Sequence, residues 1–279
     1  MSAQEPALDK GESFLRLHPV ATYFVVTFAI SWTGAFVLAA PSLMRHQAIP
    51  KMVGLLMFPV MLLGPSLAGI TLTFILDGAL GLRDLLSRFL CVRLPARWYA
   101  VLLIPPGVML TVLLGLGTFV SPVFAPNRFF VGVMFGIVAG FFEEIGWMGY
   151  AFPKMRWEHN ALTASVSLGL LWAVWHLPVI DYLGTATPHG EYWFRFFLAF
   201  AVAMAAVRVL IGWVYTNTKS VFLTQCLHAS STGSLVALSP PRVTAGQEAL
   251  WYAVYAVALW IIVAFVIRKY GERLRQQGV

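Results

Sequence analysis

The sequence FFEEIGWMGY, residues 141–150, places two adjacent carboxylates, Glu143 and Glu144, inside an apolar run that begins near Phe129. A carboxylate is costly in the hydrocarbon of a membrane, so such residues are rare, face a protein interior and mark function. Two like charges a few ångströms apart do not both ionise easily, so we expect one acid to hold a proton or to accept strong hydrogen bonds. The pair therefore predicts a polar site buried within a membrane protein.

The composition of the whole chain agrees with a membrane protein. Of its 279 residues, 59% are hydrophobic and 11% are charged, and the mean hydropathy is +0.77; soluble domains carry about 25% charged residues. The net charge of +7 would suggest nucleic-acid binding in a soluble protein. Here the basic residues concentrate between apolar segments, where they face anionic lipid. We therefore expect a polytopic all-α membrane protein with no nucleic-acid partner.

Eight apolar segments are long enough to cross a bilayer, which needs about 20 residues. They predict one transmembrane domain, 20–268, between an N-terminal tail, 1–19, and a basic C-terminal tail, 269–279. Most lysines and arginines fall on the side of the two ends, so the positive-inside rule places both termini in the cytoplasm. We expect the bundle to lie in a cytoplasmic or organellar membrane, with the cell membrane as the first choice. The expected bundle encloses a polar cavity around the acid pair. The segments are 20–40, 53–76, 98–120, 129–152, 161–180, 193–215, 220–238 and 249–267.

Two of these segments add imidazoles to the predicted cavity. His176 follows Trp172 by four residues near the end of the fifth segment, so the two share a helix face. His228 and Thr232 share a face of the seventh segment in the same way. The remaining histidines fall in tails or loops, where we expect solvated side chains: His18, His46, His159 and His189.

Two glutamates and two histidines inside a bilayer support three chemistries. A glutamate positioned by histidine can take a proton from water for hydrolysis, while other donors hold the oxyanion. The same four side chains could bind zinc, because three ligands and a water make a catalytic zinc centre. They could also relay protons or ions. Spacing alone does not choose among these, although the H-E-x-x-H pattern that favours zinc is absent from the sequence.

The order of the motifs is more specific. E-E-x-G-W-x-G-Y-x-x-P from Glu143, W-x-x-W-H-x-P from Trp172, and then His228 resemble the CPBP family of intramembrane proteases, also called Abi or type II CAAX-prenyl endopeptidase-like. The family pattern is E-E-x-x-x-R, then F-x-x-x-H, then H-x-x-x-N or another small or polar residue. The resemblance covers about residues 129–238, which we expect to form the catalytic core.

The resemblance implies a glutamate-dependent endopeptidase without a metal cofactor. It would cleave a peptide or a prenylated protein, near the C-terminus or a membrane segment, in contact with lipid. By the same resemblance, Glu143 would activate the water with His176, and Glu144 would orient the group or share its charge. His228 would stabilise the oxyanion, with Thr232 at the position where the family often has Asn.

Two positions depart from the family pattern, Met148 clearly and Trp172 mildly. Met148 stands where the pattern has Arg, so one carboxylate loses an ion-pair partner. Arg208, inside the sixth segment, is a candidate replacement, although it could instead extend to the lipid headgroups. Trp172 stands where the family often has Phe. Trp172 and Trp147 are candidates to support the substrate or the charge, against the plain reading that they pack.

Two other functions stay open from the sequence. One is a zinc-dependent intramembrane metalloprotease with Glu143, Glu144, His176 and His228 as ligands. The other is a catalytically degenerate membrane scaffold or bacteriocin-immunity protein, which Met148 motivates.

Overall fold

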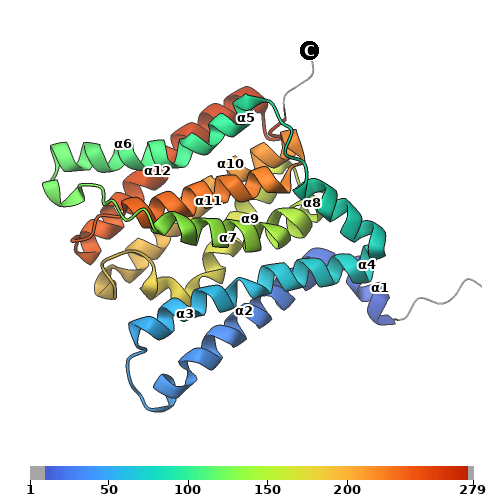
Figure 1. Cartoon of the computed structure of the whole chain (residues 1–279), viewed down its shortest axis with the longest axis horizontal. Coiled ribbons are helices and arrows are strands. Elements are labelled where there is room, and N and C mark those ends of the chain that lie inside the picture. The colour runs from blue at the N-terminus through green and yellow to red at the C-terminus, as the bar shows by residue number, and fades with distance from the viewer. Residues whose placement is uncertain (1–9, 276–279) are drawn as a thin grey trace, which may run out of the picture.

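The computed structural model of the chain describes residues 10–275, and every regular element within that range is helical (Figure 1). The predicted all-α class is therefore confirmed. Of the two predicted tails, residues 1–9 and 276–279 lie outside the described residues. The rest of the N-terminal tail contains a short helix, α1 (Lys10–Leu17), and the first long helix begins at Pro19.

Long apolar helices joined by short connections make up the bundle (Figure 1). The α-helices after α1 are α2 (Pro19–Met44), α3 (Lys51–Met61), α4 (Leu63–Phe89), α5 (Ala96–Ala100), α6 (Ile104–Phe119), α7 (Gly132–Gly146), α8 (Phe152–Met155), α9 (Ala161–Trp175), α10 (Trp193–Thr218), α11 (Val221–Leu238) and α12 (Ala245–Tyr270). The short helical turns are η1 (Val101–Leu103), η2 (Pro122–Phe124), η3 (Trp147–Ala151), η4 (Leu177–Tyr182) and η5 (Gly190–Tyr192).

Local sequence signals explain several helix starts. Proline is tolerated in a first turn because its missing N–H has no intrahelical partner there, and α2 begins at Pro19. Helices α9, α11 and α12 follow Asn160, Ser220 and Thr244. Each of these three side chains accepts a hydrogen bond from a backbone N–H of the first turn, which would otherwise lack a partner.

Six stretches of the described chain are helical, apolar and long enough to cross a membrane. They match six of the eight predicted segments. The other two predicted segments, 129–152 and 161–180, form shorter α-helices, because α7 ends at Gly146 and α9 ends at Trp175. The polytopic class is confirmed, but the count of eight is not. The six stretches are Pro19–Met44, Lys51–Phe89, Ala96–Phe119, Gly190–Thr218, Val221–Leu238 and Ala245–Tyr270.

A row of glycines brings α7 against α11. Gly132, Gly136 and Gly140 are four residues apart, so they lie on one face of α7. A Cβ added at Gly136 would collide with the backbone of Ala229 and Gly233 on α11, so only glycine permits this separation of the two helices. The next position in the row is Glu144. The helix spacing therefore turns Glu144 toward α11, while Glu143 lies about 100° away around the helix.

Helix α10 lies between α9 and α12 (Figure 1). Most of its residues from Ala199 to Thr218 are buried. Gly169 of α9 sits directly against Ala205 of α10, where a Cβ would meet the Ala205 backbone and the Cβ of Arg208. This close approach holds Arg208, one turn further along α10, in the interior of the bundle.

Candidate active site

Two indole groups hold one oxygen of Glu143. Its Oε2 accepts hydrogen bonds from Trp147 Nε1 at 3.0 Å and from Trp172 Nε1 at 2.6 Å. Trp147 lies one turn further along the same helical run, and Trp172 comes from α9. The residue is 3% exposed. Its other oxygen, Oε1, has no hydrogen-bond partner among the residues that the structure describes, so Glu143 can accept a proton there.

Glu144 has a different set of partners, on α10 and α11. Its Oε1 accepts hydrogen bonds from Arg208 Nη1 at 2.6 Å and from His228 Nδ1 at 2.7 Å. All three residues are completely buried. Because an ionised carboxylate only accepts hydrogen bonds, His228 Nδ1 carries a proton, and in the neutral ring Nε2 carries a lone pair. The two acids thus have different hydrogen-bond partners: two indoles for Glu143, and a cation with an imidazole for Glu144.

His176 is linked to Glu143 through Trp172. Its Nδ1 lies 2.8 Å from the Trp172 carbonyl oxygen. That oxygen only accepts, so Nδ1 carries the proton and Nε2 is left with a lone pair. His176 caps the end of α9 and is 8% exposed. Trp172 therefore bonds His176 with its carbonyl and Glu143 with its indole.

Trp172 also contacts the partners of Glu144. The Arg208 guanidinium carbon lies 4.1 Å from the centre of the Trp172 ring, which is cation–π distance. The His228 ring packs edge-on against the same indole, with centroids 5.0 Å apart. One aromatic side chain therefore joins the surroundings of both acids into a single cluster.

The predicted replacement of the missing family arginine is present as an ion pair. Met148 is buried in η3, and Arg208 pairs with Glu144 from α10. Arg208 is completely buried, so the alternative in which its side chain extends to the lipid headgroups is wrong. Thr232 lies on the same helix as His228, α11. It is half-buried one turn beyond His228, and no hydrogen bond joins it to the acids or imidazoles of the described chain.

The arrangement does not fit a zinc centre. Among the described residues, no three His, Cys, Asp or Glu side chains are grouped so that they could hold a metal ion. Glu144 and His228 bond to each other, while Glu143 bonds to indoles and His176 to a backbone carbonyl. The four predicted ligands are thus not gathered around one point where a metal ion could bind in the described chain. The guanidinium of Arg208, 2.6 Å from Glu144, also opposes a second cation there.

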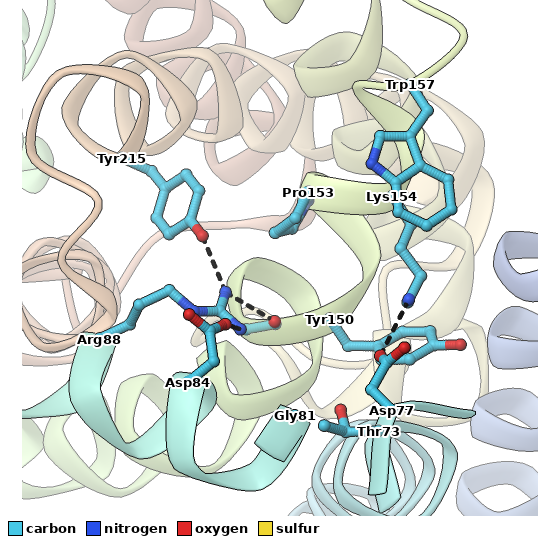
Figure 2. A pocket seen from close by; sticks show the side chains of 11 residues that line it. Thr73, Asp77, Gly81, Asp84, Arg88, Tyr150, Pro153, Lys154, Trp157 and Tyr215 are labelled. Carbon is cyan, nitrogen blue, oxygen red and sulfur yellow. Dashed lines mark hydrogen bonds and ion pairs between the residues drawn. The ribbon is translucent and has the colours of Figure 1, made fainter. Parts of the chain in front are cut away.

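The helical run that carries the acids ends in the π-helical turn η3, a rare geometry that is frequent at functional sites. A pocket of about 320 Å³ adjoins this turn, between α4, α8 and the end of α10 (Figure 2). Arg88 of α4 lines the pocket and donates from Nη1 to the Gly149 carbonyl of η3 at 2.9 Å and to the Tyr215 hydroxyl at 2.8 Å. Arg88 also pairs with Asp84 at 3.0 Å. Arg88 therefore ties the turn that follows the acids to both α4 and α10.

His189 corrects one prediction, because it was expected to be solvated and is only 1% exposed. Its Nε2 lies 3.3 Å from Oε2 of Glu248, in the first turn of α12. Glu248 also accepts hydrogen bonds from the backbone N–H groups of Thr185 and Ala186, each at 2.8 Å. The loop after His176 is thereby fixed to α12 by one buried carboxylate.

Two features that hold the site in place were not predicted from the sequence: the glycine row on α7 and the contacts of Arg88. The glycine row Gly132, Gly136 and Gly140 could have been found, because its spacing of four is visible in the sequence. Arg88 entered the prediction only as one of the basic residues that orient the bundle. No sequence pattern connects it with Gly149, because the contact joins residues that are 61 positions apart.

A bundle of apolar helices that encloses two acids, two imidazoles and a buried arginine defines a polytopic membrane protein with an acid–imidazole site in its interior. Residues 125–233 match the family described as type II CAAX prenyl endopeptidase Rce1-like. CAAX prenyl protease 2 of Methanococcus maripaludis is 29% identical over 143 residues, which are 46% of this chain and 51% of that protein. The chain thus matches about half the length of this curated relative. Both matches confirm the resemblance to the CPBP family that the motifs indicate.

Proposed function

We propose that this protein is an intramembrane endopeptidase that hydrolyses a peptide bond near the C-terminus or a membrane segment of its substrate. One observation carries the proposal: Glu143 has one oxygen fixed by two indoles, and its other oxygen has no partner among the described residues. The name of the relative, CAAX prenyl protease 2, supports a prenylated protein as the substrate. The many apolar side chains on the outer surface agree with lipid as the surrounding medium.

In the proposed reaction, water binds between Glu143 Oε1 and His176 Nε2. Glu143 takes a proton from the water as its oxygen attacks the scissile carbonyl carbon, and the carbonyl electron pair moves onto the oxygen. His228, when its ring is protonated, donates from Nε2 to that oxyanion, and Glu144 balances the imidazolium charge. Collapse of the intermediate breaks the C–N bond. The leaving amine takes its proton from Glu143, so one water is consumed.

A cleavage assay on the purified protein in lipid tests this role for Glu143. We expect wild type to cleave a farnesylated C-terminal peptide, and Glu143→Gln to lose about a hundredfold to ten-thousandfold in kcat, the range for loss of a general base. Glu158→Gln, at an exposed loop position, is the matched control and should retain activity. An unmodified membrane peptide in the same assay shows whether the prenyl group is required. Equal rates for wild type and Glu143→Gln would contradict the proposal and favour the scaffold alternative.

We further propose that the reaction needs no metal ion, because no three of the four predicted ligands are grouped so that they could hold one in the described chain. Dialysis against a strong chelator, followed by metal analysis of the protein and the same cleavage assay, checks this. We expect full activity in metal-depleted protein. Activity that disappears with zinc and returns on its addition would support the metalloprotease alternative instead.

A further inference from the structure

Arg208 has hydrogen-bonding capacity that its ion pair does not use. Its Nη1 donates to Glu144, whereas Nε and Nη2 are buried and have no hydrogen-bond partner among the described residues. These two donors form one complete edge of the planar guanidinium group. A buried arginine is costly inside a membrane, and buried donors are nearly always satisfied. Two adjacent donors without a partner at this depth therefore point to a hydrogen-bond acceptor that comes from outside the protein.

The position of this edge suits the reaction. The guanidinium group stacks on the Trp172 ring at 4.1 Å, and the indole N–H of the same ring donates to Glu143 at 2.6 Å. A single indole thus separates the arginine from the acid that we propose as the base. A substrate carbonyl beside Trp172 would have the activated water near the N–H edge of the indole and the guanidinium over the ring face.

His228 can donate to the oxyanion only when its ring is protonated, so a second donor is needed when the ring is neutral. Its Nδ1 donates to Glu144, so the neutral ring offers only a lone pair at Nε2, and that atom is also buried without a described partner. An imidazole in this state cannot donate to an oxyanion. A guanidinium remains protonated at any working pH, so its donors are always available.

We propose that Arg208 is a catalytic residue whose Nε–H and Nη2–H edge binds the developing oxyanion, while Glu144 holds the opposite side of the group in place. This inference rests on the proposed endopeptidase function and extends it, because it gives Arg208 a direct contact with the reacting atoms. Lysine can keep the ion pair with Glu144 but cannot present a two-donor edge, since an ammonium group is a point charge on a flexible chain.

The test compares wild type with Arg208→Lys in lipid, using cleavage of the farnesylated peptide and binding of two uncleavable analogues. One analogue carries a phosphinate at the scissile position, which mimics the tetrahedral anion, and the other carries a reduced amide, which has no carbonyl oxygen. We expect Arg208→Lys to lower kcat about a hundredfold, with KM nearly unchanged. We also expect phosphinate binding to weaken by a similar factor, while reduced-amide binding stays the same. Arg195→Lys, at an exposed arginine on the same helix, is the matched control.

Two outcomes would overturn the inference: Arg208→Lys with wild-type kcat, or a variant that loses both analogues equally. Equal losses would mean that Arg208 only maintains the shape of the site through Glu144. Thermal unfolding of both proteins in the same lipid identifies a folding defect. Failure of the proposed function itself has a different signature, since wild type and Glu143→Gln would then cleave the peptide equally.

Discussion

At the residue scale, the site depends on side chains that serve two partners at once. Trp172 fixes Glu143 with its indole and His176 with its carbonyl, and it stacks under Arg208. The separation of four residues indicated that Trp172 and His176 share a helix face, which was enough to predict that they lie close together. It could not show that an indole N–H would point at a carboxylate, because that depends on how α9 packs against α7.

The indole donors give a prediction at this scale. Trp172→Phe keeps the ring but removes the 2.6 Å hydrogen bond to Glu143. A hydrogen bond to a charged group contributes about 1.5–3 kcal/mol, so we expect kcat to fall roughly tenfold to a hundredfold. Steady-state cleavage of the farnesylated peptide measures it. Trp213→Phe is the control, because the buried Trp213 Nε1 has no hydrogen-bond partner in the described chain. A Trp172→Phe variant as fast as wild type would mean that Trp172 only packs.

At the element scale, the path of α7 decides which acid meets which partner. The glycine row turns Glu144 toward α11, and Glu143 consequently faces α9. The sequence predicted a helix here and its buried acids, but their separate environments follow from helix contacts that no single segment encodes. The same holds for His176. The structure connects His176 to Glu143 through Trp172, a link that the shared helix face of Trp172 and His176 does not reveal.

Close packing of α7 on α11 yields the second prediction. Gly136→Leu should destabilise the protein by more than about 3 kcal/mol, because the side chain would push against the α11 backbone. Gly107→Leu on α6 should be tolerated, since a Cβ there meets nothing within 4 Å. Thermal unfolding in detergent compares the two variants with wild type. Equal stability of both variants would show that α7 and α11 can separate without cost.

The contact of Arg88 with η3 yields the third prediction. Arg88→Met should lower the free energy of unfolding by about 2 kcal/mol, because the Gly149 carbonyl and the Tyr215 hydroxyl both lose a charged donor. Arg83→Met, an exposed arginine on the same helix, should change it little. Chemical denaturation in mild detergent measures both. A similar effect of the two substitutions would remove the structural role of Arg88.

At the scale of the whole molecule, composition was sufficient for the class but not for the number of spans. Hydropathy averages count apolar residues, and they do not register where a helix changes geometry. The segment 161–180 is apolar throughout, yet α9 ends at Trp175 and the chain continues as the turn η4. The position of the loop beyond η4 could not be predicted from the sequence either, because the loop is held by Glu248 of α12, about 60 residues away along the chain.

Both described ends lie on one side of the bundle. The end of α12 bonds to the start of α9, with Asn160 Nδ2 3.1 Å from Glu272 Oε2 and Leu162 N 2.9 Å from the Glu272 carbonyl. Helix α1 packs against α4 on the same side (Figure 1). The excess of basic residues on this side supports our proposal that it is cytoplasmic.

Sidedness can be measured with single cysteines after Cys91 and Cys226 are replaced by serine. Gln47→Cys, in the exposed turn between α2 and α3, should react with an impermeant maleimide on intact cells. Glu158→Cys, exposed between α8 and α9, should react only after the membrane is opened. Labelling in the reverse order would place the termini outside.

The ion pair between Arg208 and Glu144 has a consequence for recognising active members among related sequences. A search that requires the contiguous family motif would classify this chain as an inactive homologue, because residue 148 is a methionine. A search that tests for an ion pair with the second acid in the folded structure would keep this chain, because Arg208 on another helix pairs with Glu144. Related chains with no basic residue at either equivalent of positions 148 and 208 are then the ones to exclude. Chains with a basic residue at only one of these positions form a single group, in which the ion pair with the acid comes from either of two helices.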